Sequence, residues 1–257
     1  MVLTSASSAP IATKSLLDSV GSEGKNTINS VYKIICPKTR KKGTGFLIKE
    51  GFIITNNHVI EECNENEIRV FSFRNNEIKL KKVINDKVRD LAILFPKSRL
   101  GGGLELIEEK VEPGIMVCTW GFPLRYRGPA PLLSTGFLAG FSVDGGVKKF
   151  IINGAFNEGN SGGPLLRAEE SKVLGVVVSK HLPLLTPFIT SAIRALRENS
   201  SGVVFLATDE DGNEKQFVES QLVAEILIRY YEMSQVVIGE AIQSCEVIKF
   251  LKENKLR

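Results

Sequence analysis

One serine of this chain stands where it could act as a nucleophile. It is Ser161, within the sequence GNSGGP at residues 159–164. A hydroxyl attacks a carbonyl at neutral pH only when a general base takes its proton and amide donors stabilise the oxyanion that forms. Glycines beside the serine let the backbone turn its N–H groups inward and let a substrate approach closely. The hexapeptide alone also fits a tight turn between two strands, so its context must decide.

Candidates for the base and for an orienting acid lie upstream of the serine. His58 follows the apolar segment 51–54, and Asp90 opens the apolar sequence DLAIL at residues 90–94. The order histidine, aspartate, serine is that of the chymotrypsin template, and it differs from the orders in subtilisin and the α/β-hydrolases. Asp86, four residues before Asp90, is a competing acid. The residue types and their order predict acyl-transfer chemistry.

Four motifs in the right order resemble one protein family. They are GTGF at 43–46, TNNHV at 55–59, DLAIL at 90–94 and GNSGGPL at 159–165. They are similar to those of trypsin-like serine proteases with the chymotrypsin fold, and most similar to the high-temperature-requirement (Deg) branch, from about residue 31 to about residue 197. The resemblance favours Asp90 over Asp86, because the DLAIL motif begins at Asp90.

The resemblance and the needs of acyl transfer assign roles to these residues. Ser161 would attack the scissile carbonyl, His58 would remove its proton and later donate it to the leaving amine, and Asp90 would orient the imidazole. The amides of Gly159 and Ser161 would form the oxyanion hole.

The resemblance also places the pocket for the residue before the scissile bond, P1. Because Ala155 is not an acid, cleavage after lysine or arginine is disfavoured, and small or medium apolar P1 residues are expected. A preference for an acidic P1 residue, attracted by Lys180 and His181, is a weaker alternative, because a charge at the rim normally faces water. The residues expected to line this pocket are Ala155, Phe156, Asn157, Glu158, Val178, Ser179 and Lys180.

Asn160 departs from proteases that are activated by cleavage, which often carry an aspartate there to pair with a new N-terminal amine. An amide cannot make that ion pair. We therefore expect that the enzyme is not switched on by N-terminal insertion, and that any regulation rearranges the loop at 154–159.

The strand pattern predicts an all-β fold of two six-stranded antiparallel β-barrels, because short apolar segments recur between turn residues. The first barrel is expected at about 28–100, with strands near 31–35, 43–49, 52–56, 67–73, 76–84 and 90–95. The second is expected at about 111–190, with strands near 115–120, 132–142, 147–152, 163–168, 173–179 and 186–190. His58 and Asp90 would then face Ser161 across the cleft between the barrels.

The ends of the chain are expected to lie outside these barrels. Residues 1–27 are predicted to be an N-terminal arm that is either flexible or packed on the body, and 28–200 to be the protease domain. A helix near 191–197 closes that domain. Residues 201–257 are predicted to be a C-terminal extension with a hairpin at 203–218 and amphipathic helices at 218–230 and 237–251. These helices either pack on a barrel or mediate self-association or docking of a protein partner. No PDZ module is recognisable, unlike most of the Deg branch.

The composition of the 257 residues is that of an ordinary soluble chain, and its net charge of +4 is mild. Basic residues gather at 38–42 and 79–82, where solvated strand faces explain them, so no nucleic-acid partner is expected. No segment reaches the length of about 18 apolar residues that a membrane span needs, so no membrane association is expected. No metal or cofactor is expected.

Four cysteines are too few for a disulfide scaffold in a chain of this length. Secreted trypsins commonly carry a bridged cysteine directly after the histidine, where this chain has Val59. The N-terminus lacks the features of a secretory signal. A cytoplasmic location is therefore predicted.

The sequence favours a serine endopeptidase that hydrolyses peptide bonds in protein substrates. Two alternatives stay open: a catalytically silent binding or scaffold protein with the trypsin fold, and an esterase that uses the same residues.

Overall fold

The computed structural model describes residues 16–39, 41–124, 126, 128–168, 170–178, 187–199, 201–208, 214–233 and 238–257. These residues form two compact units. The first comprises the described residues of 1–181 together with those of 237–257, and the second comprises the described residues of 182–236. Each unit is described by itself below.

The first barrel of unit 1 is a seven-stranded antiparallel sheet with the order β5-β4-β1-β2-β3-β7-β6. Its strands are β1 (Val31–Cys36), β2 (Lys41–Leu47), β3 (Ile53–Thr55), β4 (Arg69–Ser72), β5 (Glu77–Ile78), β6 (Leu80–Asp86) and β7 (Leu91–Pro96). The strand predicted at 76–84 breaks at Lys79, where the chain leaves β4 and begins to pair with β7. One continuous segment therefore joins the two edges of the sheet, and the predicted six strands are present.

The second barrel is a closed ring with the order β12-β9-β10-β11-β16-β13, because β12 also pairs with β13. A short strand, β8, adds to the outside of β13 in the parallel direction. The strands are β8 (Glu105–Leu106), β9 (Met116–Gly121), β10 (Leu132–Asp144), β11 (Val147–Gly154), β12 (Pro164–Arg167), β13 (Lys172–Val178) and β16 (Ile238–Gln243). The prediction of two antiparallel six-stranded barrels is thus correct in architecture.

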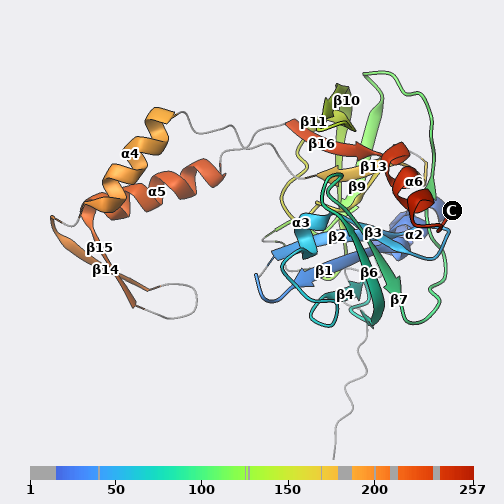
Figure 1. Ribbon diagram of the computed structural model, residues 1–257, viewed down its shortest axis with the longest axis horizontal. Coiled ribbons are helices and arrows are strands. Elements are labelled where there is room, and N and C mark those ends of the chain that lie inside the picture. Colours follow the sequence, from blue (N-terminus) through green and yellow to red (C-terminus); the bar gives the residue numbers. More distant parts are fainter. Residues whose placement is uncertain are drawn as a thin grey trace, which may run out of the picture. The chain divides into compact units, whose positions relative to one another are not determined.

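The sixth strand of the second barrel is not the predicted one. Within the predicted strand 186–190, residue 186 lies outside the described residues and the rest belongs to the helix α4 (Pro187–Glu198). The place of the predicted sixth strand is taken by β16, which lies between β11 and β13 (Figure 1). We predicted a helix at 237–251, but only its second part is helical, as α6 (Ser244–Glu253).

The physical reason lies in the burial of β16. Ala241 packs inside the second barrel, whereas the adjacent Ile242 packs in the core between the barrels. A strand that is buried on both faces has no polar and apolar alternation, so its sequence cannot be told from a buried helix by periodicity alone.

Three clusters of buried apolar side chains hold unit 1 together. One fills each barrel, and the third lies between the barrels. Helix α2 (Ser22–Ser30) adds Ile28 to the third cluster, and Leu16 and Leu17 pack against it. The predicted N-terminal arm therefore packs on the body from residue 16 onward, and residues 1–15 lie outside the described part. Helix α6 adds four further apolar side chains to the same cluster.

Unit 2 contains α4, the antiparallel hairpin of β14 (Val204–Thr208) and β15 (Glu214–Val218), and α5 (Glu219–Met233). Arg197 of α4 pairs with Glu225 of α5 at 3.2 Å. The predicted hairpin and the helix at 218–230 are confirmed. The predicted boundary at residue 200 differs from the division of the structure, because residues 238–257 belong to unit 1. Self-association or partner docking through the C-terminal helices stays a prediction.

No helix in the described ranges has the length and apolar character needed to cross a membrane. Two of the four cysteines, Cys36 and Cys63, form a disulfide, while Cys118 and Cys245 are free. The disulfide joins the end of β1 to the loop after the short helix α3 (Asn57–Ile60). Disulfides persist in oxidising compartments. The cysteines of this chain therefore no longer favour a reducing compartment.

Candidate active site

His58 lies on α3, directly after the short strand β3. Its ring atom Nδ1 is 2.7 Å from Oδ2 of Asp90, and its backbone N–H donates to Oδ1 of the same carboxylate at 2.9 Å. The two side chains are 35% and 31% exposed, respectively, so they sit at a surface cleft. One carboxylate therefore holds both the backbone and the ring of the histidine, which leaves Nε2 directed away from the acid.

The backbone of Asp90 is held as firmly as its side chain. Its φ of 54° lies in the left-handed region, which aspartate tolerates better than most residues. The carbonyl of Asp90 accepts hydrogen bonds from Nδ2 of Asn56 at 3.0 Å and from the backbone N–H of Asn57 at 3.2 Å. The turn before β7 and the segment before α3 are thus joined at the point where the acid meets the histidine.

The competing acid, Asp86, has other partners. Its Oδ1 accepts the backbone N–H groups of Val88 and Arg89, and its Oδ2 pairs with the guanidinium of Arg89 at 2.6 Å. Arg89 also pairs with Glu253 at 2.6 Å and with the buried Glu246 at 3.4 Å, both on α6. Asp86 therefore closes the turn and helps to fasten it to the C-terminal helix, while Asp90 faces the histidine.

Ser161 lies in the loop between β11 and β12, and a side chain of the first barrel holds that loop. The N–H of Thr44 donates to the carbonyl of Ser161 at 2.8 Å, and its hydroxyl donates to the carbonyl of Gly159 at 2.6 Å. The same hydroxyl accepts the N–H of Phe122 at 3.1 Å, and the carbonyl of Thr44 accepts the hydroxyl of Thr55 at 2.7 Å. One fully buried threonine of β2 therefore fixes the serine against the barrel that carries the histidine.

Glycine is required on both sides of the serine. Gly159 has a φ of 90°, and a Cβ there would collide with the backbone of Phe122 and Leu124. Gly162 has a φ of 83°, and a Cβ there would collide with the carbonyl of Thr44 and the hydroxyl of Thr55. These two positions explain the glycines of the GNSGGP motif as close approaches of backbone to backbone.

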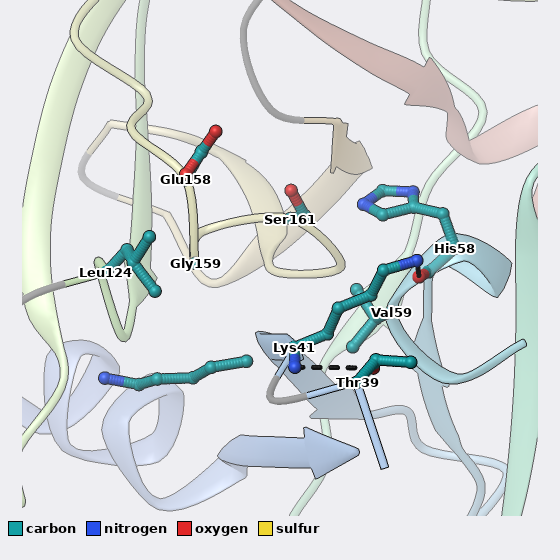
Figure 2. A pocket seen from close by; sticks show the side chains of 9 residues that line it. Thr39, Lys41, His58, Val59, Leu124, Glu158, Gly159 and Ser161 are labelled. Atoms are coloured by element: carbon teal, nitrogen blue, oxygen red, sulfur yellow. Dashed lines mark hydrogen bonds between the residues drawn. The ribbon is translucent and has the colours of Figure 1, made fainter. Parts of the chain in front are cut away.

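The serine and the histidine line the same cavity, of about 330 Å³. Figure 2 shows the hydroxyl of Ser161 and the imidazole of His58 next to each other, with Gly159 on the other side of the serine. The cavity is lined by Thr39, Lys41, Lys42, His58, Val59, Leu124, Glu158, Gly159 and Ser161.

Among the described residues that were predicted to bind substrate, some line the cavity and others do not. Glu158 lines the cavity, Ala155 is exposed, Asn157 is half-buried, and Val178 packs partly against the core between the barrels. Ser179, Lys180 and His181 lie outside the described residues.

Phe156 is not a substrate contact in this structure, which contradicts our prediction. It is fully buried inside the second barrel. Its ring lies close to Gly136, Gly154 and Gly239, where side chains would compete for the same space. A large apolar side chain beside three glycines fills the interior rather than the cleft.

Asn160 is also fully buried, so it does not face the cleft. Its Nδ2 is 3.5 Å from the hydroxyl of Ser134, and its Oδ1 has no hydrogen-bond partner among the described residues. The expectation that N-terminal insertion does not activate the enzyme stays a prediction.

Sequence reasoning missed three residues that position the site. Thr44 lies within the GTGF motif, Asn56 lies within TNNHV, and Arg89 directly precedes Asp90. The motifs contained the first two, but no rule of spacing indicates that a threonine in one barrel holds a loop of the other. Their roles depend on contacts between distant segments.

Several known proteins are similar to this chain. An uncharacterized protein, y4bJ, of Sinorhizobium fredii is 36% identical over 146 residues, which is 54% of this chain and 22% of that protein. A probable periplasmic serine endoprotease, DegP-like, of Rickettsia conorii is 33% identical over 160 residues, which is 58% of this chain and 30% of that protein. A protein of the same description from Hahella chejuensis is 32% identical over 148 residues, or 54% of this chain and 30% of the relative. The alignments thus span less than a third of these relatives.

Among solved structures, the active form of the Rv3671c protease of M. tuberculosis is similar, with a TM-score of 0.59 and 20% identity. The match covers 93% of this chain and 85% of that one. At this identity the likeness establishes the fold alone.

Two relatives are described as periplasmic, so they do not support the cytoplasmic location predicted from the sequence. That location stays a prediction, and the disulfide between Cys36 and Cys63 gives it no support either.

The family described as trypsin-like peptidase domain matches residues 43–176, which is just over half of the chain. The match begins at the first glycine of the GTGF motif and includes the histidine, the aspartate and the serine discussed above. The chain therefore belongs to the family of trypsin-like peptidase domains.

Proposed function

We propose that the chain is a serine endopeptidase that cleaves protein substrates through a triad of Ser161, His58 and Asp90. Proteins of this family act on proteins or peptides, and relatives are described as endoproteases. The observation that carries the proposal is the double contact of Asp90 with His58, at 2.7 Å to the ring and 2.9 Å to the backbone.

Each residue has a defined task in this mechanism. The hydroxyl of Ser161 attacks the scissile carbonyl while His58 takes its proton at Nε2, and an acyl-enzyme forms. His58 then gives that proton to the leaving amine. Asp90 keeps the other ring proton on Nδ1 and stabilises the imidazolium. Water enters after the amine has left and releases the acyl group by the same steps in reverse.

The amides of Gly159 and Ser161 are the proposed donors to the oxyanion. Gly159 lines the cavity beside the serine, and its carbonyl is turned toward the hydroxyl of Thr44. Backbone donors that are fixed before the substrate arrives need no reorganisation during the reaction. Removing one such donor typically lowers kcat by a factor of about 100 to 1,000.

An active-site-directed fluorophosphonate tests the proposal. Wild type should be labelled, whereas Ser161→Ala should not, and His58→Ala should be labelled far more slowly. Cleavage of an unfolded protein such as reduced casein should fall by about 10⁶-fold in Ser161→Ala. An enzyme that is labelled but cleaves only small esters would be an esterase. Wild type that is neither labelled nor active on any substrate would be the catalytically silent scaffold, and the proposal would fail.

A further inference from the structure

Lys42 is a lysine of the cavity with no carboxylate partner among the described residues. Its ammonium donates to the carbonyls of Pro123 at 3.3 Å and Tyr126 at 2.9 Å, and among the described residues it forms no ion pair. Burial, with a smaller contribution from the charge of Lys33, lowers the pKa of Lys42. The site therefore holds a partly buried cation that is solvated by two neutral oxygens.

The neighbouring lysine of the same strand differs in this respect. Lys41 pairs with Glu61 at 3.4 Å and with Glu62 at 3.2 Å, and it also donates to the carbonyl of His58. Its charge is already balanced by two acids. Two lysines that follow each other in sequence thus have different electrostatic environments, and only Lys42 is left to attract a ligand.

A partly desolvated cation without a counter-ion favours an anionic ligand. The ammonium has lost some of its water, and a carboxylate would restore a charge-assisted hydrogen bond. Truncating one partner of such a pair generally weakens binding more than truncating an exposed charge does. Glu158, the acid on the cavity wall beside Gly159, is exposed, so water and salt screen its repulsion.

The position of Lys42 in the cavity bears on which part of the substrate it would meet. In the mechanism above, His58 protonates the leaving amine, so the peptide that follows the scissile bond lies over the histidine. Strand β2 passes directly behind the nucleophile, because the N–H of Thr44 donates to the carbonyl of Ser161. Lys42, two residues before Thr44 on that strand, lines the cavity together with His58 and Val59.

We propose that Lys42 selects substrates with a carboxylate one or two residues after the scissile bond. The inference rests on the proposed function and names a substrate class for it. The carboxylate belongs either to a glutamate or aspartate side chain or to a free C-terminus, and the experiment separates these two sources.

The test uses internally quenched peptides with valine before the scissile bond. The peptides form pairs that carry glutamate or glutamine at the first or the second position after it, each with a free or an amidated C-terminus. Wild type should cleave the better glutamate peptide with a kcat/KM about tenfold above that of its glutamine partner, since a charged hydrogen bond contributes about this factor. An advantage of the same size for free over amidated short peptides would identify a C-terminal carboxylate instead.

Variants at Lys42 then assign the preference. Lys42→Gln should bring the ratio of kcat/KM for the glutamate and glutamine peptides close to one, and Lys42→Glu should reverse it. Lys81→Gln removes one exposed lysine of β6 and should keep the wild-type ratio. A purely structural role of Lys42, through its hydrogen bonds to Pro123 and Tyr126, would lower kcat/KM for both peptides alike and leave the ratio unchanged.

A binding measurement keeps this inference separate from the proposed function. Fluorescence anisotropy of the labelled peptides with Ser161→Ala should give about tenfold tighter binding of the glutamate peptide, with or without turnover in wild type. Equal binding of both peptides, or a wild-type ratio near one, would overturn the role of Lys42 while fluorophosphonate labelling still supported the triad.

Discussion

The two barrels differ in how the chain builds them. The first uses one uninterrupted segment, 31–96, and carries the histidine and the aspartate. The second takes most of its strands from 105–178 and one more from 238–243, beyond unit 2, and carries the serine. The contiguous barrel was predicted strand by strand, whereas in the interrupted one the last strand was misplaced. Local sequence patterns therefore predict a barrel only where its strands follow one another in the sequence.

The two barrels also differ in what holds their reactive residues. His58 and Asp90 hold each other through two hydrogen bonds within the first barrel. The loop of Ser161 is held from outside its own barrel, by Thr44. The geometry of the Ser161 loop therefore depends on the packing of both barrels, while that of His58 and Asp90 is local.

The largest expected effect comes from removing the distant strand. Ending the chain after residue 236 deletes β16 and α6 and opens the ring between β11 and β13. Because both strands then lose a hydrogen-bonded neighbour, the truncation should abolish cooperative unfolding. Circular dichroism during heating measures this. Excising 182–236 instead should leave a folded protein, because Val178 and Glu240 are paired neighbours that a short loop can join.

The two deletions control for each other. Because the excision removes more residues than the truncation, a loss of folding in the truncated chain alone cannot come from the number of residues removed. A truncated chain that still unfolds cooperatively, or an excised chain that does not fold, would contradict the assignment of β16 to the second barrel.

Asp90→Asn tests the local geometry of the first barrel. An amide in place of the carboxylate favours the wrong tautomer of His58, and kcat for peptide hydrolysis should fall about 10⁴-fold. Asp86→Asn is the matched control and should keep kcat within a few-fold of wild type, because Asp86 contacts Arg89. Equal losses in both variants would mean that the acid was wrongly assigned.

The disulfide should stabilise the first barrel through the unfolded state. It closes a loop between residues 27 apart in sequence. Replacing Cys36 and Cys63 by alanine should lower the free energy of unfolding by about 3 to 4 kcal/mol, as measured by urea denaturation. Wild type in reducing agent should show the same loss. An unchanged denaturation midpoint in both experiments would rule out this contribution.

Alkaline pH should produce the smallest effect, and it compares one buried group from each barrel. Burial raises the pKa of Tyr32 in β1 from 10.0 to about 12, and that of the Cys118 thiol in β9 from 9.0 to about 11. The unfolded chain releases these protons at lower pH than the folded chain does. The stabilising contribution is therefore complete below pH 9 and declines as the pH rises toward 11 for the cysteine and 12 for the tyrosine.

Urea denaturation at pH 8 and pH 10.5 measures this decline. Between the two pH values, Tyr32→Phe should reduce the loss of stability by about 1 kcal/mol and Cys118→Ala should reduce it by about 2 kcal/mol. A variant that loses as much stability as wild type over this range would show that its group does not titrate differently in the folded and unfolded states.

The sequence by itself determined most of the architecture, and it named the candidate site residues. Motifs such as GNSGGP and DLAIL are local, since glycine is needed where backbones touch and apolar residues where a strand is buried. His58, Asp90 and Ser161 could therefore be named, and the first barrel could be placed, without coordinates. The same local patterns located the hairpin and the long helix of unit 2.

Only the tertiary structure decided which distant segments meet. Ala241 and Ile242 could be buried in either a helix or a strand. They belong to a strand because their segment pairs with both β11 and β13. Phe156 lies in the loop before the GNSGGP motif. Its side chain is nevertheless buried in the second barrel, where three glycines leave room for the ring. Thr44, Arg89 and Lys42 make contacts with partners far away in the chain. Strand pairing and side-chain burial depend on contacts between distant segments, and a short stretch of neighbouring residues gives no information about these contacts.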